Sequence, residues 1–273
     1  AEQALSQNPL LEKALLVKGE ALLSLGRFAE ALDCLAGVNK ESESFLAAQL
    51  KRAFCLLMRN DFPGAVAALS LAEANLHWRV HTRVYRRFVA LLAGDSAGAT
   101  LPNNIGDSEL YQRIVLDILG RLLDLQEFEK FEQALPLLDF LPPEKRQLEL
   151  GKLYFGRGFS DSAAEELIGA IRLGVEDAEA LGMLGEIAVE KGFLEDAAVF
   201  YRRAIELDNQ YLPHHTGLAS VLAQLGQYAE ARAILERVLQ KFPESVLLRR
   251  TLEEIGQGLV PGNSSSKVVA YKH

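Results

Sequence analysis

The residues whose types could carry out chemistry gather in one stretch, residues 76–87 (LHWRVHTRVYRR), which holds four arginines, two histidines and the only tryptophan of the chain. His77 and His81 lie four residues apart, so on a helix they face the same way, as two zinc ligands would need to. No acidic or cysteine partner lies at a usable spacing. We therefore favour a helix-capping or surface role for these histidines over metal binding.

The arginines beside Trp78 and Tyr85 imitate a nucleic-acid site, with cations for phosphates and aromatic rings for stacking on bases. The whole chain is acidic, because 37 Asp and Glu outweigh 29 Lys and Arg and give a net charge of −8. Proteins that bind nucleic acid or anionic membranes usually present a broad basic surface. We therefore expect no nucleic-acid partner.

Motifs of catalysis and metal binding are missing from the sequence, which contains no HExxH, no Walker-type phosphate loop and no GxSxG. Paired carboxylates such as Glu165 and Glu166 fit a solvated helix face. The adjacent His214 and His215 point in different directions on a helix and lack a third ligand of the usual type. We predict no catalytic residue, no metal site and no cofactor, and hence a protein that is not an enzyme.

Cysteine usage and hydropathy bear on the compartment. Cys34 and Cys55 lie in apolar segments that are typical of helices and lack the spacing of a metal site, so we expect unpaired buried thiols. Free thiols favour the cytoplasm over the periplasm, although the periplasm stays open. No apolar run approaches the ~20 residues that a membrane-spanning helix needs, so we expect no direct membrane insertion.

A repeated pattern explains many of the glycines. Segments such as GEALLSLGRFAEAL share a small residue, a turn residue seven positions later and an alanine five positions beyond that. A helix that reverses within two or three residues tends to need a left-handed backbone there, which Gly and Asn adopt most readily. The turn position recurs at intervals of 34, 34, 32, 32, 34 and 34 residues, at Gly26, Asn60, Gly94, Gln126, Gly158, Gly192 and Gly226.

The two other positions favour close packing of the two helices in each unit, because small side chains let helices approach one another. The position seven residues before the turn is small in five of the seven units and is Arg87 or Leu119 in the others. The position five residues after the turn holds Ala31, Ala65, Ala99, Ala163, Ala197 and Ala231, with Phe131 as the exception.

This pattern resembles the tetratricopeptide repeat, a 34-residue helix-turn-helix unit, over roughly residues 1–259. The resemblance implies an all-α, right-handed superhelical solenoid of about seven helix-turn-helix repeats with a C-terminal capping helix. The implied repeats lie near residues 12–45, 46–79, 80–111, 112–143, 144–177, 178–211 and 212–245, and the capping helix covers residues 244–259. Residues 1–11 would end a preceding repeat and residues 260–273 would form a flexible tail or linker, so we expect a segment of a larger protein or a trimmed one.

The third unit departs from the pattern. Its expected second helix reads SAGATLPNNIGD, which is a poor helix, and Arg87 occupies its small position. Arg79, Arg83 and Arg87 recur every four residues on the side that should pack against that helix, which we expect to be missing or short. We predict that Arg83 or Arg87 contacts an acid of the following loop, at Asp95, Asp107 or Glu109.

The resemblance also implies where a partner binds, because the first helix of each unit in such arrays lines a concave groove that holds peptides or protein segments. In the first three units this face is unusually apolar, and exposed apolar surface of this extent marks an interaction site. The predicted partner-binding residues are Leu16, Val17, Leu50, Lys51, Phe54, Met58, His81, Val84, Tyr85 and Phe88. The alternative is that the superhelix itself, or a neighbouring domain, buries them.

The same face of the later units is more polar and carries residues such as Arg113 and Asp117, which would fix the direction of a bound segment. Some family members hold a peptide's C-terminal carboxylate with a set of Lys, Asn and Arg side chains on three consecutive first helices. The matching positions hold Leu16, Glu20, Lys51, His81 and Tyr85, so binding of that kind is not expected.

The predicted function is a non-enzymatic protein-interaction scaffold that binds a peptide or partner protein in its groove. Two alternatives stay open, because a repeat fold of this kind serves many processes. One is a substrate-recruiting or regulatory part of a larger enzyme, such as a glycosyltransferase. The other is a periplasmic assembly array for bacterial exopolysaccharide or pilus export. No particular partner and no oligomeric state are predicted.

Overall fold

The computed structural model describes residues 9–73, 75–101 and 107–257, and all the regular structure in them is helical. The predicted all-α class is therefore confirmed. The chain divides into two compact units between Leu141 and Pro142, and each is described by itself. The predicted tail over residues 260–273 lies outside the described residues, as does most of the predicted end of a preceding repeat. No helix in the described ranges is long and apolar enough to cross a bilayer.

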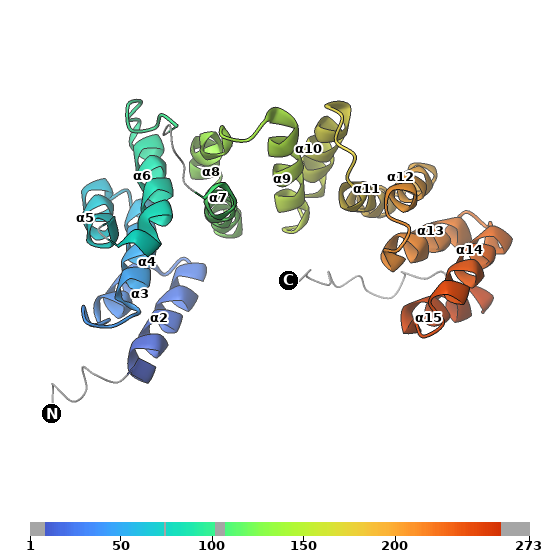
Figure 1. Cartoon of the computed structure of the whole chain (residues 1–273), viewed down its shortest axis with the longest axis horizontal. Coiled ribbons are helices and arrows are strands. Elements are labelled where there is room, and N and C mark those ends of the chain that lie inside the picture. The colour runs from blue at the N-terminus through green and yellow to red at the C-terminus, as the bar shows by residue number, and fades with distance from the viewer. Residues whose placement is uncertain (1–8, 74, 102–106, 258–273) are drawn as a thin grey trace. The chain divides into compact units, whose positions relative to one another are not determined.

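The first unit consists of helix pairs joined by short turns, drawn from blue to green in Figure 1. Each helix packs mainly on its neighbours in the chain. The α2 helix begins at Pro9, so residues 9–11 belong to the first helix of the first pair and not to the end of a preceding repeat. Its helices are α2 (Pro9–Ser24), α3 (Phe28–Ala36), α4 (Phe45–Met58), α5 (Phe62–Glu73), η1 (Leu76–Trp78), α6 (Arg79–Ala93), α7 (Ser108–Asp124), α8 (Phe128–Ala134) and η2 (Leu135–Leu138).

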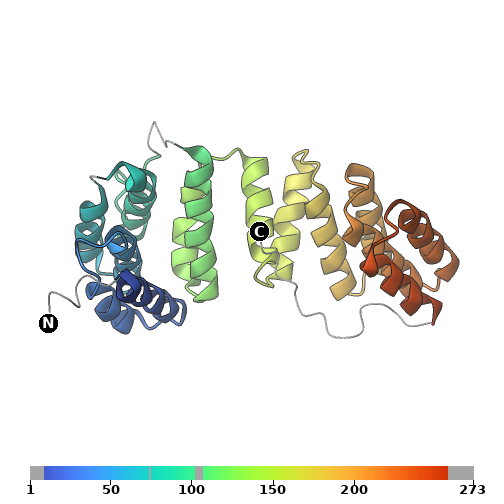
Figure 2. The same cartoon turned by 60° about the horizontal axis from the view of Figure 1, so that its bottom comes forward.

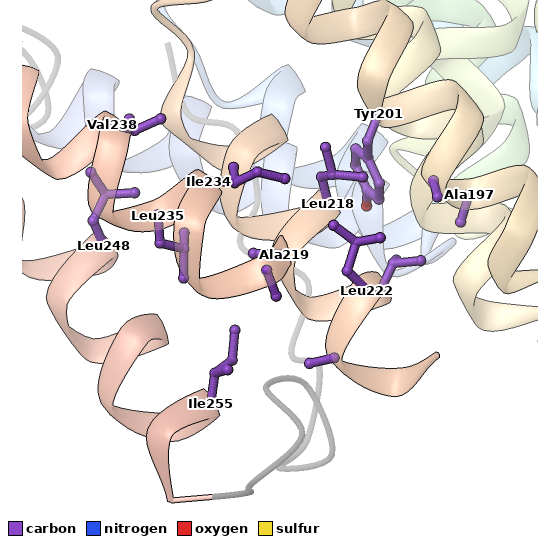
Figure 3. Packing of buried hydrophobic residues seen from close by; sticks show 14 of the residues in the cluster. Ala197, Tyr201, Leu218, Ala219, Leu222, Ile234, Leu235, Val238, Leu248 and Ile255 are labelled. Carbon is purple, nitrogen blue, oxygen red and sulfur yellow. The ribbon is translucent and has the colours of Figure 1, made fainter. Parts of the chain in front are cut away.

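The second unit contains three regular pairs followed by one further helix, drawn from green to red in Figures 1 and 2. Its helices are α9 (Pro143–Phe155), α10 (Ser160–Arg172), α11 (Ala178–Glu190), α12 (Leu194–Leu207), α13 (Leu212–Gln224), α14 (Tyr228–Lys241) and α15 (Val246–Gly256). Figure 3 shows Leu248 and Ile255 of α15 in the same apolar cluster as Leu235 of α14 and Leu222 of α13. The α15 helix therefore covers the apolar face of the last pair.

The seven predicted turn residues all have a left-handed backbone, with φ between 59° and 78°. In each turn the following residue donates its N–H to the carbonyl four residues before the turn residue, at 2.8–3.0 Å, as in the bond from Arg27 to Leu22. This bond is the longer of the two in the Schellman motif, which satisfies carbonyls that the helix end leaves open. The turn positions predicted from the sequence are therefore confirmed.

Close approach of paired helices depends on the small residues. A Cβ atom added to Gly19 of α2 would lie 2.5 Å from Cδ2 of Leu35 in α3, and one added to Gly185 of α11 would lie 2.9 Å from the Tyr201 ring in α12. Both distances are shorter than any ordinary contact, so an alanine at either position would require the Leu35 side chain or the Tyr201 ring to shift. The alanines of the matching position on the second helices are fully buried, apart from the half-buried Ala99.

The third pair is incomplete, as the sequence predicted. The described residues after α6, as far as Leu101, form turns and no helix. Arg87 of α6 is only 4% exposed, and its guanidinium donates to the carbonyls of Ala99 (2.9 Å), Pro136 (2.8 Å) and Leu137 (3.3 Å). Residues of η2 thus accept hydrogen bonds at a place where a second helix would otherwise pack.

The acid that Arg87 meets is Asp139, whose Oδ2 lies 3.9 Å from Nη2, so the predicted contact with Asp95, Asp107 or Glu109 is wrong for Arg87 and stays a prediction for Arg83. The carbonyls are closer than this carboxylate, so backbone groups provide most of the compensation for burying the charge. The prediction of buried, unpaired thiols is confirmed for Cys55, whereas Cys34 is half-buried.

Candidate partner-binding site

A cavity of about 540 Å³ lies within the first unit. The first helices α2, α4, α6 and α7 and the short helix η1 all contribute side chains to it. Its lining consists of Leu23, Ala47, Leu50, Lys51, Phe54, His77, Trp78, His81, Tyr85, Leu110, Arg113, Ile114, Asp117 and Arg121.

The floor of the cavity is apolar. Leu50 and Phe54 stand one turn apart on α4, and Tyr85 of α6 and Ile114 of α7 complete the floor. All four are buried, and Phe54 is 1% exposed. The Phe54 ring also packs against Phe88 of α6, with ring centroids 6.4 Å apart. Because residues four apart lie on one face of a helix, the sequence spacing alone brings such side chains to the same face.

Aromatic rings form one side of the rim. The Trp78 ring lies 4.8 Å from the His81 ring and 5.5 Å from the His77 ring, measured between centroids. His77 is exposed, whereas His81 is half-buried and its Nδ1 atom makes no hydrogen bond in the described structure. Burial, together with the nearby His77 and Arg113, lowers the pKa of His81. The same surroundings therefore favour the uncharged form of this imidazole.

Charged groups also stand at the rim, and one of their partners lies beside it. Glu20 of α2 pairs with Lys51 of α4 and, at 2.5 Å, with Arg121 of α7. Arg121 also donates to Asp117 at 2.9 Å. One carboxylate thus bridges cations from two other helices, which ties α2, α4 and α7 together.

Burial and the neighbouring Arg121 lower the pKa of Lys51 to about 8, and Asp117 opposes this shift only in part. Burial also acts to lower the pKa of Arg121, but Asp117 outweighs it and raises that pKa. Arg113 differs from both, because it is exposed and forms no ion pair or hydrogen bond in the described structure. It is the one cation of the lining without a carboxylate partner among the described residues.

Five of the ten predicted partner-binding residues line the cavity, namely Leu50, Lys51, Phe54, His81 and Tyr85. Met58, Val84 and Phe88 are instead buried in the core of the unit, which is the alternative foreseen for this face. Leu16 is half-buried near Leu35 and Ala48, and Val17 is 68% exposed. Neither of these two residues lines the cavity.

The fourth unit contributes two residues that the sequence placed on this face but that were not among the ten predicted partner-binding residues. His81 and Tyr85 of α6 have counterparts 32 residues later, Arg113 and Asp117 of α7, and both line the cavity. The 32-residue spacing of the turns predicts this correspondence, and it places both residues beside the apolar part of the predicted surface. His77 and Trp78 precede α6 in η1, and no register of the first helices includes them.

In the second unit, charged side chains at the corresponding face of the first helices form ion pairs with one another. Lys152 of α9 pairs with Asp177 (3.1 Å) and Glu179 (2.5 Å). Burial acts to lower the pKa of Lys152, but the two carboxylates outweigh it and raise that pKa. His214 and His215 are buried in α13, where the His214 ring lies against Tyr211 and Nε2 of His215 lies 3.0 Å from the Asn209 carbonyl.

Comparison with known proteins agrees with this description. One family model described as tetratricopeptide repeat matches residues 188–254, and a second of the same description matches residues 16–76 and 148–211. A comparison with curated protein sequences finds no match.

Solved structures resemble the chain in fold. The MamA protein is 23% identical over 54% of this chain and 82% of its own, with a TM-score of 0.46. PilW, described as a widely conserved type IV pilus biogenesis factor, is 15% identical over 77% of this chain and 100% of its own, with a TM-score of 0.46. YrrB, described as a TPR protein with an unusual peptide-binding site, is 16% identical over 83% of this chain and 97% of its own, with a TM-score of 0.42. The two family matches and the ladder of left-handed turns together show that the chain belongs to the tetratricopeptide repeat family.

Proposed function

We propose that the protein is a non-enzymatic scaffold that binds a peptide, or an extended segment of a partner protein, in the cavity between α2, α4, α6 and α7. Its membership of the tetratricopeptide repeat family supports a protein-interaction scaffold in general. The observation that carries the more specific proposal is the cavity itself, which combines an apolar floor with aromatic and charged groups at its rim.

The dimensions of the cavity suit side chains of a partner. Ligand pockets in proteins are usually roughly 300–1,000 Å³ and mainly apolar, with a few polar groups that fix orientation. At about 540 Å³ the cavity falls within this range. A pocket of this size takes one or two side chains of a segment whose remaining residues lie along the first helices.

Two other functions remain compatible with the same site. A scaffold, a recruiting part of a larger enzyme and a periplasmic assembly array would all bind a partner segment in this way. No described contact favours the latter two, so the scaffold is the proposal.

The test is to fill the mouth of the cavity without disturbing its floor. Ala47 is half-buried on α4 and lines the cavity, so the substitution Ala47→Arg places a long side chain there. Val199 of α12 is exposed in the second unit, and Val199→Arg is the matched control. Proteins that co-purify with each variant are quantified by mass spectrometry against those that co-purify with the unaltered protein.

We expect Ala47→Arg to lose at least one specific partner that Val199→Arg retains, by about tenfold or more. If every partner is recovered equally with both variants, the cavity is not the binding site. Circular dichroism spectra of both variants verify that a loss is not due to unfolding.

A further inference from the structure

We propose that the partner segment presents a large apolar or aromatic side chain to the cavity and an acidic side chain beside it, and that Arg113 binds the acidic group. This inference rests on the proposed function, and it adds the chemistry of the partner.

The apolar part of the segment is required by the floor. Leu50 and Tyr85 line the floor with carbon surface apart from the Tyr85 hydroxyl, Phe54 packs beneath them at 1% exposure, and Trp78 extends the apolar lining to the rim. Aromatic rings gain additional energy from offset or edge-on contact with other rings, beyond the burial of area. A polar side chain in the same place would lose its water and would find only the Tyr85 hydroxyl as a partner on the floor.

The charges in and beside the cavity indicate that the partner segment carries an acidic side chain. The lining contains three cations, Lys51, Arg113 and Arg121, and one anion, Asp117. Glu20 beside the cavity pairs with Lys51 and Arg121, and Asp117 pairs with Arg121. After these pairs are formed Arg113 alone has no partner, so the rim keeps one uncompensated positive charge in a chain whose net charge is −8.

Arg113 also stands beside the apolar floor and not away from it. It lies one turn before Asp117 on α7, and its neighbour on that helix, Ile114, is part of the floor. It is near enough to His81 to lower the pKa of that imidazole. A carboxylate bound to Arg113 would therefore lie within a residue or two of a side chain inserted into the cavity, and a guanidinium group can bind a carboxylate through two parallel hydrogen bonds.

A basic segment suits the site less well. Asp117 is the only carboxylate in the lining, and its Oδ2 already accepts from Arg121 at 2.9 Å. A lysine or arginine of the partner would compete with Arg121 and would lie near the unpaired Arg113. Repulsion between Arg113 and a cation of the partner would weaken binding. The arrangement that favours an acidic segment therefore disfavours a basic one.

The experiment uses four fluorescent decapeptides and the complete chain, with binding followed by fluorescence anisotropy. The first has a core of Asp-Glu-Phe-Leu-Asp between Gly and Ser residues. The second replaces the three acids by Asn, Gln and Asn, and the third replaces them by Lys, Arg and Lys. The fourth keeps the acids but replaces Phe and Leu by Ser and Ala.

We expect the first peptide to bind about three- to tenfold more tightly than the amide peptide, which is the effect of one partly exposed charged hydrogen bond. The basic peptide and the peptide without Phe and Leu should bind more weakly still. Arg113→Gln should abolish the difference between the acidic and amide peptides, and Arg113→Glu should make the basic peptide the tighter ligand. Arg237→Glu makes the same change of charge at an exposed position of α14 and should leave the order unchanged.

Other outcomes separate this inference from the proposed function. If the acidic and amide peptides bind equally, or if Arg113→Glu leaves their ratio unchanged, the inference is overturned while the cavity remains a binding site. If no peptide binds although Ala47→Arg still loses a natural partner, the acidic and apolar chemistry is wrong. If no peptide binds and Ala47→Arg retains every partner, the proposed function fails as well.

Discussion

The two units follow one backbone pattern but differ in how side chains pack around their first helices. In the first unit the side chains between the first helices α2, α4, α6 and α7 leave a cavity of about 540 Å³. In the second unit the Tyr201 ring of α12 lies so close to α11 and α13 that a Cβ added to Gly185 or Gly217 would lie 2.9 or 2.7 Å from it. A Cβ added to Gly182 would lie 2.5 Å from Nε2 of His214. The repeat therefore sets the positions of the helices in both units, and the first unit adds a cavity lined by four of its first helices while rings of the second unit pack against the backbone of α11 and α13.

The units also differ in how regular they are. The three turns of the second unit all have glycine at the left-handed position, whereas the first unit has Asn60 and Gln126 at two of its four turns. The first unit also contains the incomplete third pair, where Arg87 bonds to carbonyls of η2. The unit with the candidate site is thus the one with more departures from the pattern, in agreement with the general observation that local rules are broken at functional sites.

Removing the Arg87 side chain should give the largest effect. Arg87→Ala leaves three buried or half-buried carbonyls without their donor, and we expect a loss of about 3–5 kcal/mol in the free energy of unfolding of the first unit. Hydrogen exchange measured by mass spectrometry should show faster exchange in α6 and η2 and unchanged exchange in α13. Arg79→Ala, at an exposed position of the same helix, is the control and should change little. Equal effects from the two variants would contradict the buried role of Arg87.

The next effect compares a tight glycine from each unit. Gly185→Ala would press on a Tyr201 ring that is also confined by Gly217, so we expect a loss of about 2–3 kcal/mol. Gly19→Ala meets the end of a leucine side chain, which can change rotamer, and should cost about 1 kcal/mol. Gly256→Ala meets no atom within 4 Å and serves as the control in urea unfolding. A larger loss from Gly19→Ala would show that the second unit is not the more tightly packed one at this register.

Lys51 should make the stability of the first unit depend on pH. An unfolded lysine keeps its proton to about pH 10.4, whereas Lys51 in the folded chain releases it near 8. Between these values the unfolded state binds more protons, so rising pH should stabilise the folded state, by about 1–2 kcal/mol for this partly exposed group. Urea unfolding at pH 8 and pH 10 should show this gain in the unaltered protein and not in Lys51→Met. If the pair with Glu20 dominates instead, the unaltered protein should lose stability relative to the variant over the same range.

The smallest effect concerns the turns. Gln126→Gly relieves a left-handed backbone at a residue with a Cβ atom, and we expect a gain of about 0.5–1 kcal/mol in the first unit. Gly192→Gln makes the opposite change in the second unit and should cost a similar amount. Thermal unfolding of the two variants and of the double variant measures both. A gain from Gly192→Gln would mean that the turn position does not select for glycine.

The turn ladder was predictable because it depends on local chemistry. A left-handed residue followed by the Schellman hydrogen bond is determined within six residues, and all seven positions were found from residue types and spacing together. The partners of Arg87 were not predictable, because Pro136 and Leu137 lie about fifty residues away in the chain. No local pattern indicates that a short helix there accepts hydrogen bonds from α6.

The candidate site was predictable in part. Helical spacing placed Leu50, Phe54, His81 and Tyr85 on the inner face, and each lines the cavity. The same spacing could not separate cavity from core, because Val84 and Phe88 follow the same pattern and are fully buried. That distinction depends on how neighbouring helices close over each side chain, which is a property of tertiary packing.

Both cysteines of the chain lie in the first unit, so thiol chemistry reports on that unit alone. Burial raises the pKa of Cys55 to about 11, and its side chain has no exposed surface, so it cannot be alkylated while the unit stays closed. The rate at which a maleimide reagent labels Cys55 therefore measures how often α4 separates from its neighbours. The labelling rate of Cys55 thus reports the opening of the candidate binding unit. A bound partner that keeps the unit closed should lower this rate.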